Sequence, residues 1–218
     1  MKMLVVFEKT PRLRHIGHLD LMRAIQRSLR RSGLPIRYSQ GFNPHMLMSF
    51  AAPLALGHAA LREVMEVPLF ENVPEERFRL ALQASLPDDI IVRGARAVAD
   101  EHKSPMALLT AARYRLELPD DPVPGQEEID AFLARDTIPV MKKTKTREQI
   151  VDIKPMIHEM AVRDGMLYAT LALTEAASCK PELLMSAFYG ERPVPRVVVT
   201  RLCLFGEAGG CLVPLETL

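Results

Sequence analysis

The sequence lacks the features that mark several large classes of protein. Its three cysteines, Cys179, Cys203 and Cys211, are odd in number and far apart, so they predict neither a disulfide framework nor a CxxC metal site. No apolar run approaches the ~20 residues that a membrane-spanning helix needs, and Glu8 interrupts the start before a signal-peptide core is complete. These absences predict a cytoplasmic protein with reduced thiols and no membrane partner.

The motifs of common nucleotide-binding and hydrolytic enzymes are also absent. The chain has no Walker A loop and no GxGxxG fingerprint, and its serines lack the GxSxG elbow. No cysteine has a histidine close to it in the sequence, so no nucleophile arrangement is visible. We therefore expect no cofactor, and we find no complete catalytic constellation.

The composition is that of a folded protein, with 48% hydrophobic and 25% charged residues in a chain of 218. This length suffices for one large domain or two smaller ones. The net charge of +1 hides an asymmetry, because the first 50 residues hold only Glu8 and Asp20 against a larger basic set. The basic residues there are Lys2, Lys9, Arg12, Arg14, Arg23, Arg27, Arg30, Arg31 and Arg37. Arginine matches phosphate oxygens well, so this region indicates either an anionic partner or a solvated basic face.

Residues 17–34 predict a helix with two different sides. Its expected apolar stripe consists of Leu19, Met22, Ile25 and Leu29. Arg23, Arg27, Arg30 and Arg31 recur at i, i+4, i+7 and i+8, which places them together away from that stripe. We call these four residues the arginine face.

The order of predicted elements repeats along the chain. Residues 1–98 read as strand, helix, strand, strand, helix and strand, and residues 107–205 read the same way. Asp164-Gly165 is a hairpin signal between two strands of the second series. This βαββαβ order predicts an α+β protein of two tandem ferredoxin-like domains with antiparallel sheets, at residues 1–102 and 103–218.

The segment Tyr38 to His45, "YSQGFNPH", follows the basic helix. Gly41 and Pro44 favour a tight, rigid turn. Turn chemistry does not explain Tyr38, Phe42 and His45, whose flat rings are typical of a platform for nucleobases. Two interpretations stand, namely packing of a turn and a stacking surface.

The segment "RHIGHLD" gathers His15, His18 and Asp20. Histidines and a carboxylate are possible metal ligands, but Asp20 is explained by the dipole at the helix start, and we predict no metal site. For His18 we expect a hydrogen-bonding or phosphate-contacting role or a structural one. His18 and His45 are the candidates for a catalytic acid or base.

The second series carries an extra piece at residues 137–155, "TIPVMKKTKTREQIVDIKP". It is basic at Lys142, Lys143, Lys145 and Arg147. We interpret it either as a phosphate-binding strip or as a solvated loop.

The run "HIGHLDLMRAIQRSLRRSGLPIRYSQGFNPHMLMSFAAPLALG" resembles the opening of the radical-SAM-linked protein family. This is a bacterial group of uncharacterised function whose members occur beside, or fused to, a B12-type radical SAM protein. The segments "KTREQIVDIKP" and "RVVVTRL" are similar to that family's second half. The resemblance implies a B12-type radical SAM protein as partner. Because this chain lacks the clustered cysteines that hold an iron-sulfur cluster, it would act as the companion of that enzyme.

Together these observations predict a non-catalytic RNA-binding accessory protein that presents tRNA or ribosomal RNA to a radical SAM modifying enzyme. One alternative is a metal-independent RNA-processing or RNA-modifying enzyme that uses a histidine, and another is a protein-protein adaptor for the radical SAM partner. The predicted RNA-binding residues are Arg14, His18, Arg23, Arg27, Arg30, Arg31, Tyr38, Phe42, Asn43, His45, Lys142, Lys143, Lys145 and Arg147.

Overall fold

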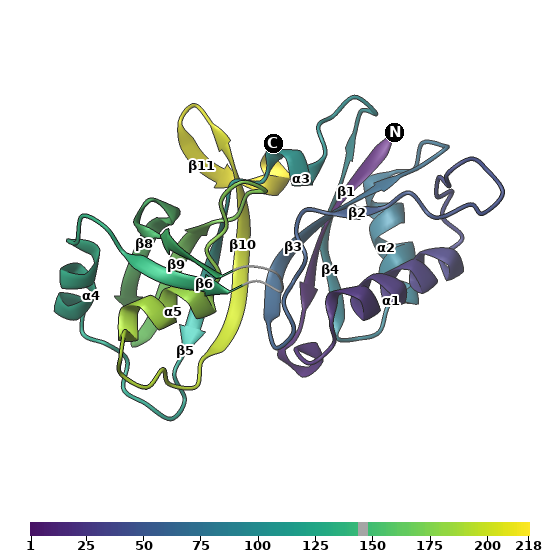
Figure 1. Ribbon diagram of the computed structural model, residues 1–218. Coiled ribbons are helices and arrows are strands. Elements are labelled where there is room, and N and C mark those ends of the chain that lie inside the picture. The colour runs from purple at the N-terminus through teal and green to yellow at the C-terminus, as the bar shows by residue number, and fades with distance from the viewer. Residues whose placement is uncertain (144–147) are drawn as a thin grey trace. The chain divides into compact units, whose positions relative to one another are not determined.

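The structure is a computed structural model that describes residues 1–143 and 148–218. It has a mixed α+β fold, and within these residues it contains five α-helices and mostly antiparallel strands (Figure 1). No helix in the described ranges is both long and apolar enough to cross a membrane. The chain forms two compact units, residues 1–109 with 203–218 and residues 110–202. The division predicted from the sequence runs between residues 102 and 103 and does not include this return of the last residues to the first unit.

The first unit is built around an antiparallel sheet. Its central strand is β1 (Lys2–Lys9), with β4 (Ile90–Val98) on one side and β3 (Ala59–Pro68) on the other. The short β2 (Ser49–Phe50) pairs with β3. The apolar and β-branched run of β1 suits a strand that is buried on both faces.

Two helices cover one face of this sheet, α1 (His18–Arg31) and α2 (Glu75–Ser85) (Figure 1). Met3, Val5 and Phe7 of β1 join the hydrophobic core on this side. Because side chains alternate along a strand, Leu4, Val6 and Glu8 lie on the opposite face. A 3-10 turn at Pro11–Leu13 precedes α1, and a one-turn helix α3 (Pro105–Leu108) follows β4.

The core-facing side of α1 differs from the predicted stripe. Leu21, Ile25 and Leu29 are buried, whereas Leu19 is 59% exposed. Leu21, Ile25 and Leu29 follow one another at intervals of four residues, and Leu19 lies about 200° around the helix from Leu21. The prediction for Leu19 was therefore wrong, and those for Ile25 and Leu29 were right.

Lys9 holds the segment that leads into α1. Its side chain is buried, and its Nζ donates to the main-chain oxygens of Ile16 at 2.8 Å, His58 at 3.1 Å and Arg14 at 3.4 Å. These bonds occupy a buried ammonium group and fix the course of the chain between β1 and α1.

The second unit contains a sheet in the order β5 (Ala111–Glu117), β9 (Met166–Ala172) and β8 (Ile157–Arg163). Its helices are α4 (Gln126–Leu133) and α5 (Pro181–Tyr189), and Phe132 packs edge-on against Phe188. As predicted, Asp164 and Gly165 form the β8–β9 turn, both with positive φ. The second unit also contains η2 (Lys154–Met156) and the start of β10 (Val198–Ala208), whereas β11 (Cys211–Pro214) and η3 (Leu215–Thr217) belong to the first unit.

Two strands in the structure differ from those predicted from the sequence. Between α1 and β3, where the sequence predicts a full strand, only Ser49–Phe50 forms a named strand, while Ile36 and Tyr38 make isolated bridges with Leu69 and Met46. The predicted strand at residues 107–118 begins at Ala111, after α3.

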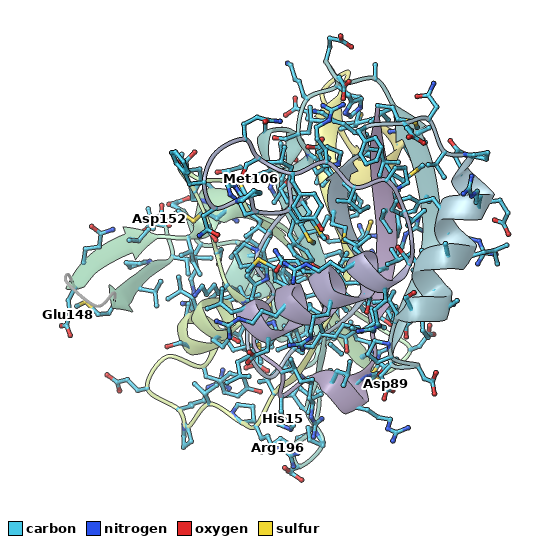
Figure 2. The ribbon with its side chains drawn as sticks, turned by 90° about the vertical axis from the view of Figure 1, so that its right-hand side faces the viewer. His15, Asp89, Met106, Glu148, Asp152 and Arg196 are labelled. Atoms are coloured by element: carbon cyan, nitrogen blue, oxygen red, sulfur yellow. The ribbon has the colours of Figure 1, made fainter. Side chains whose placement is uncertain are left out.

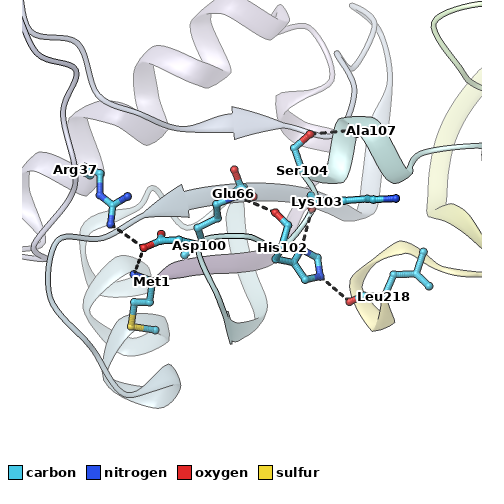
Figure 3. A network of polar contacts seen from close by, with 10 residues as sticks. Met1, Arg37, Glu66, Asp100, His102, Lys103, Ser104, Ala107 and Leu218 are labelled. Atoms are coloured by element: carbon cyan, nitrogen blue, oxygen red, sulfur yellow. Dashed lines mark hydrogen bonds and ion pairs between the residues drawn. The ribbon is translucent and has the colours of Figure 1, made fainter.

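Polar contacts join distant parts of the sequence within the first unit (Figure 3). Asp100 accepts from Arg37 at 3.3 Å and from the amino group of Met1 at 3.2 Å. Lys2 donates to the main-chain oxygen of His102 at 2.9 Å, and His102 Nε2 lies 3.0 Å from the main-chain oxygen of Leu218. The last residues of the chain are thus connected to the segment after β4.

Candidate nucleic-acid interface

The arginine face lies on the solvent side of α1, and its four members differ in what they contact. Arg23 pairs with Asp20 at 3.2 Å, one turn away on the same helix. Arg31 donates to the main-chain oxygen of Ser85 at 2.6 Å and to Ser28 Oγ at 3.1 Å. In the part of the chain that the structure describes, neither Arg27 nor Arg30 has an ion pair or a hydrogen-bonded partner for its guanidinium. These two groups are available to an external anion.

The segment from Tyr38 to Met46, which we call the aromatic loop, is closed at its base. A bridge joins Tyr38 to Met46, and Ser39 N donates to the main-chain oxygen of His45 at 2.9 Å. Ser39 Oγ accepts from His45 N at 3.0 Å and lies 2.8 Å from His45 Nδ1. These contacts order the loop base without help from a ligand.

The tip of the aromatic loop points its ring into solvent. Gly41 has φ of 122°, a conformation that residues with a Cβ rarely adopt. Phe42 is fully exposed, and Asn43 is exposed beside it. Packing within the chain therefore does not account for Phe42, which leaves this ring accessible to a partner.

A hollow of about 440 Å³ brings part of the predicted set together. Its wall includes Arg30 from α1 and Tyr38 from the base of the aromatic loop. Phe70 and Arg77 complete a group of two arginines and two aromatic residues. We call this site the arginine–aromatic hollow.

Phe70 and Arg77 were missed by the sequence analysis. Phe70 is 63% exposed and is followed by Glu71 and Asn72, which also line the hollow. The available signal was an aromatic residue in a polar segment ending at Pro74, the same kind of pattern that drew attention to Phe42. The pairing of Ile36 with Leu69 brings this segment beside Tyr38, and local sequence does not reveal that pairing.

Arg14 and His18 lie away from the hollow. His18 is the first residue of α1, and Arg30 is near the end of this helix of 14 residues, which spans roughly 20 Å. The His18 ring packs edge-on against Phe50, with 5.1 Å between centroids. Arg14 Nε donates to His15 Nε2 at 3.1 Å. The structure thus gives His18 a packing contact within the protein.

The two catalytic candidates occupy different settings. His18 is half-buried against Phe50, whereas His45 is exposed at the base of the aromatic loop. Within the described ranges, no group of three or more His, Cys, Asp and Glu residues is arranged to hold a metal ion.

The basic insertion forms a separate hairpin in the second unit, β6 (Pro139–Lys143) and β7 (Glu148–Asp152). Figure 2 shows Asp152 at one end of this hairpin and Glu148 at the other. The backbone register places Lys142 opposite Gln149 and Lys143 opposite Glu148. Lys145 and Arg147 lie outside the described residues.

Asp152 fixes the base of this hairpin. Its Oδ1 accepts from Ile138 N at 2.8 Å and from Lys154 N at 3.0 Å. These two backbone N–H groups, Ile138 first, hold the pKa of Asp152 below its ordinary value because they stabilise the carboxylate.

Comparisons with known proteins give a family and a distant structural likeness. One chain of the structure titled "Crystal Structure of a Cbf5-Nop10-Gar1 Complex" is 12% identical, with a TM-score of 0.48. The match covers 93% of the present chain and 48% of that chain, so the protein spans about half the length of the matched chain. A search of curated proteins finds no match.

A family described as "Uncharacterized protein conserved in bacteria (DUF2344)" matches residues 2–183. This match covers well over half of the 218 residues. The chain therefore belongs to the DUF2344 family.

Proposed function

We propose that this protein binds RNA through the first unit and presents it to a separate radical SAM enzyme that modifies tRNA or ribosomal RNA. The observation that carries the RNA-binding part is the arginine–aromatic hollow. Two guanidiniums line a space of one nucleotide's scale together with two rings on which a base can stack. The radical SAM partner is supported by the sequence resemblance.

The lack of internal ion-pair partners for part of the arginine face, within the described residues, supports the same proposal. Guanidiniums bind phosphate oxygens in a bidentate manner, and they do so best when no internal carboxylate competes. Arg30 meets this condition within the described residues, and Arg27 lies one turn before it on the same face. A backbone phosphate at α1 would place the adjoining nucleotide beside Tyr38 and Phe70.

The element order supports a related proposal about architecture. We assign each half of the chain to a ferredoxin-like domain because the strand order β1–β3–β2 of the first unit is matched by β5–β9–β8 of the second, with the first strand of each series beside the third and the third beside the second. Helices α1 and α2 then lie on one sheet face, as this fold requires.

The test removes the charges of Arg27 and Arg30 and measures how the affinity for RNA depends on salt concentration. We expect the double substitution Arg27→Gln and Arg30→Gln to weaken binding of a labelled 20-nucleotide single-stranded RNA. For single strands each lost phosphate contact reduces the slope of log K against log salt by about 0.7, so the two together should reduce it by about 1.4. Fluorescence anisotropy between low and high salt measures this slope.

The matched control removes two exposed arginines from the second unit, Arg135→Gln with Arg196→Gln. Both side chains are exposed, and the control changes the net charge by the same amount. Equal loss of slope in the two double variants, or an affinity of the unsubstituted protein that is independent of salt, would refute the proposed interface. RNA shortened or altered during incubation would favour the alternative in which His18 or His45 acts as acid or base.

A further inference from the structure

The sheet of the first unit has a cavity of about 510 Å³ on the face away from α1 and α2. Its floor is formed by Leu4 and Val6, the β1 side chains that alternate with the core residues Met3, Val5 and Phe7. Leu61 adds further apolar surface. Small-molecule sites are commonly of roughly 300–1,000 Å³ and mainly apolar with a few fixed polar groups, which describes this cavity.

The rim of the cavity presents positive charge that buried carboxylates hold in place. Arg93 Nε donates to Glu8 Oε2 at 2.8 Å, and Arg62 pairs with Glu216. The side chains of Glu8 and Glu216 are only 10% and 11% exposed, whereas those of Arg93 and Arg62 are 53% and 52% exposed. A ligand arriving from solvent therefore meets guanidiniums first, in orientations that the carboxylates behind them have already fixed.

Two buried polar atoms at the wall have incomplete hydrogen bonding. Arg96 uses its Nη2 to donate to the main-chain oxygen of Leu218. Its Nε, like Glu216 Oε2, is buried without a hydrogen-bonded partner among the described residues. A buried donor or acceptor left in this state costs free energy, which a ligand bearing both an acceptor and a donor would recover in part.

Gly94 keeps the floor of the cavity open. It lies opposite Val6 across the β1–β4 pair, and a Cβ added there would meet nothing within 4 Å. A side chain at this position can therefore enter the cavity without displacing the backbone.

From these features we propose that the cavity binds a small organic anion with an apolar body. The apolar body lies against Leu4, Val6 and Leu61, and the anionic group accepts hydrogen bonds from the arginine rim. None of the residues that line this cavity belongs to α1 or to the aromatic loop, so the site is separate from the proposed RNA interface.

Two matched dyes test the charge requirement. The sulfonate 8-anilinonaphthalene-1-sulfonate carries an aromatic body, an N–H group and one negative charge, and N-phenyl-1-naphthylamine is its neutral counterpart. We expect the sulfonate to bind the unsubstituted protein at least about tenfold more tightly than the neutral dye, as measured by fluorescence titration. Equal affinity for the two dyes would overturn the proposal.

Two substitutions on β4 test the location. Gly94→Leu fills the cavity, and we expect it to weaken sulfonate binding at least about tenfold. Ala97→Leu adds the same side chain to the other face of the strand, since Ala97 pairs with the core residue Met3, and it should leave binding within about twofold. Unchanged affinity in a folded Gly94→Leu protein would exclude this cavity as the site.

A measurement on the unsubstituted protein keeps the test independent of variant folding. In methyl-labelled protein, the sulfonate should shift the signals of Leu4, Val6 and Leu61 at lower concentration than those of Leu19 and Leu80, which are exposed on α1 and α2. The reverse order would contradict the proposal. Displacement of the dye by single-stranded RNA would also contradict it, because the cavity would then belong to the RNA interface.

Discussion

The arginines of α1 and those around the sheet cavity belong to the same unit but differ in their contacts. Arg62, Arg93 and Arg96 each contact an oxygen atom of the chain, on Glu216, Glu8 and Leu218. These partners lie 154, 85 and 122 residues away in the sequence. Arg27 and Arg30 have no such partner in the described residues. The fold thus orients one arginine set through its own oxygen atoms and leaves part of the other set without an internal partner within the described ranges.

Among the arginines of these two sets, we expect substitution of Arg93 to change the free energy of unfolding most. Replacement by Met removes the charge partner of Glu8, a carboxylate that is almost fully buried. Hydrogen bonds to charged groups contribute about 1.5–3 kcal/mol, so Arg93→Met should lower the free energy of unfolding by roughly 2 kcal/mol. Arg27→Met, on the exposed side of α1, should change it by less than about 0.5 kcal/mol. Urea denaturation measures both values.

A double-mutant cycle sharpens this prediction. Glu8→Gln removes the charge that Arg93→Met leaves unpaired, so the double variant should lose less stability than the sum of the two single losses. Strict additivity would show that the ion pair contributes nothing to folding. A loss at Arg27 equal to that at Arg93 would remove the distinction between the two arginine sets.

Arg31 tests whether the distinction holds within one helix. It belongs to the arginine face by sequence spacing, but its guanidinium donates to Ser85 at the end of α2 and to Ser28. We expect Arg31→Ala to reduce the free energy of unfolding by about 1 kcal/mol, the usual contribution of a hydrogen bond. Arg30→Ala, which breaks no contact of this kind, is the matched control and should be nearly neutral.

The same two variants should rank in the opposite order for RNA. Arg30→Ala removes an available guanidinium from the hollow, so it should weaken RNA binding more than Arg31→Ala does. Anisotropy titration at low salt gives both affinities. If Arg31→Ala has the larger effect on RNA and none on stability, the assignment of roles within α1 is wrong.

The features that the sequence predicts correctly depend on local spacing. The i, i+4, i+7 recurrence places Arg23, Arg27 and Arg30 on one solvent face of α1, and the Asp164-Gly165 turn joins β8 to β9. Gly41 takes the positive φ that a tight loop requires. Each of these features depends on residues that are close in the sequence, within about two turns of a helix or within a single hairpin turn or loop.

The features that the sequence does not reveal depend on pairing between distant segments. The core side of α1 is set by contacts with the sheet, which select Leu21 over Leu19. Phe70 and Arg77 reach the hollow because the segment before α2 pairs with residues 35–37. The last residues of the chain join the first unit through contacts such as that of Arg62 with Glu216. Hydrophobic periodicity reports which face of an element is buried, but it does not identify the distant segment that packs against it.

We expect the smallest effect from the partly exposed ion pair of Arg37 and Asp100. Arg37 is not buried, and because Asp100 is its partner, its guanidinium is not free to bind an external anion. The hydrogen bond from Arg37, followed by that from the amino group of Met1, holds the pKa of Asp100 below its ordinary value. A carboxyl whose pKa is lower in the folded state adds stability above its unfolded pKa, about 3.9, and this stability is lost as the pH falls through the folded pKa. The stability advantage of the unsubstituted protein over Asp100→Asn should therefore be constant from pH 7 to about pH 5 and decline below about pH 4.

Denaturation at a series of pH values measures this advantage, and Arg37→Gln serves as its control. Without the Arg37 guanidinium the pKa of Asp100 rises toward its ordinary value, so the difference between Arg37→Gln and the double variant with Asp100→Asn should be smaller at pH 7. Because both partners are partly solvent-exposed, salt should weaken the effect, whereas the contribution of Arg93 with the buried Glu8 should depend less on salt. An advantage that grows as the pH falls would reverse the sign derived from the Arg37 contact and show that Asp100 is better accommodated when protonated.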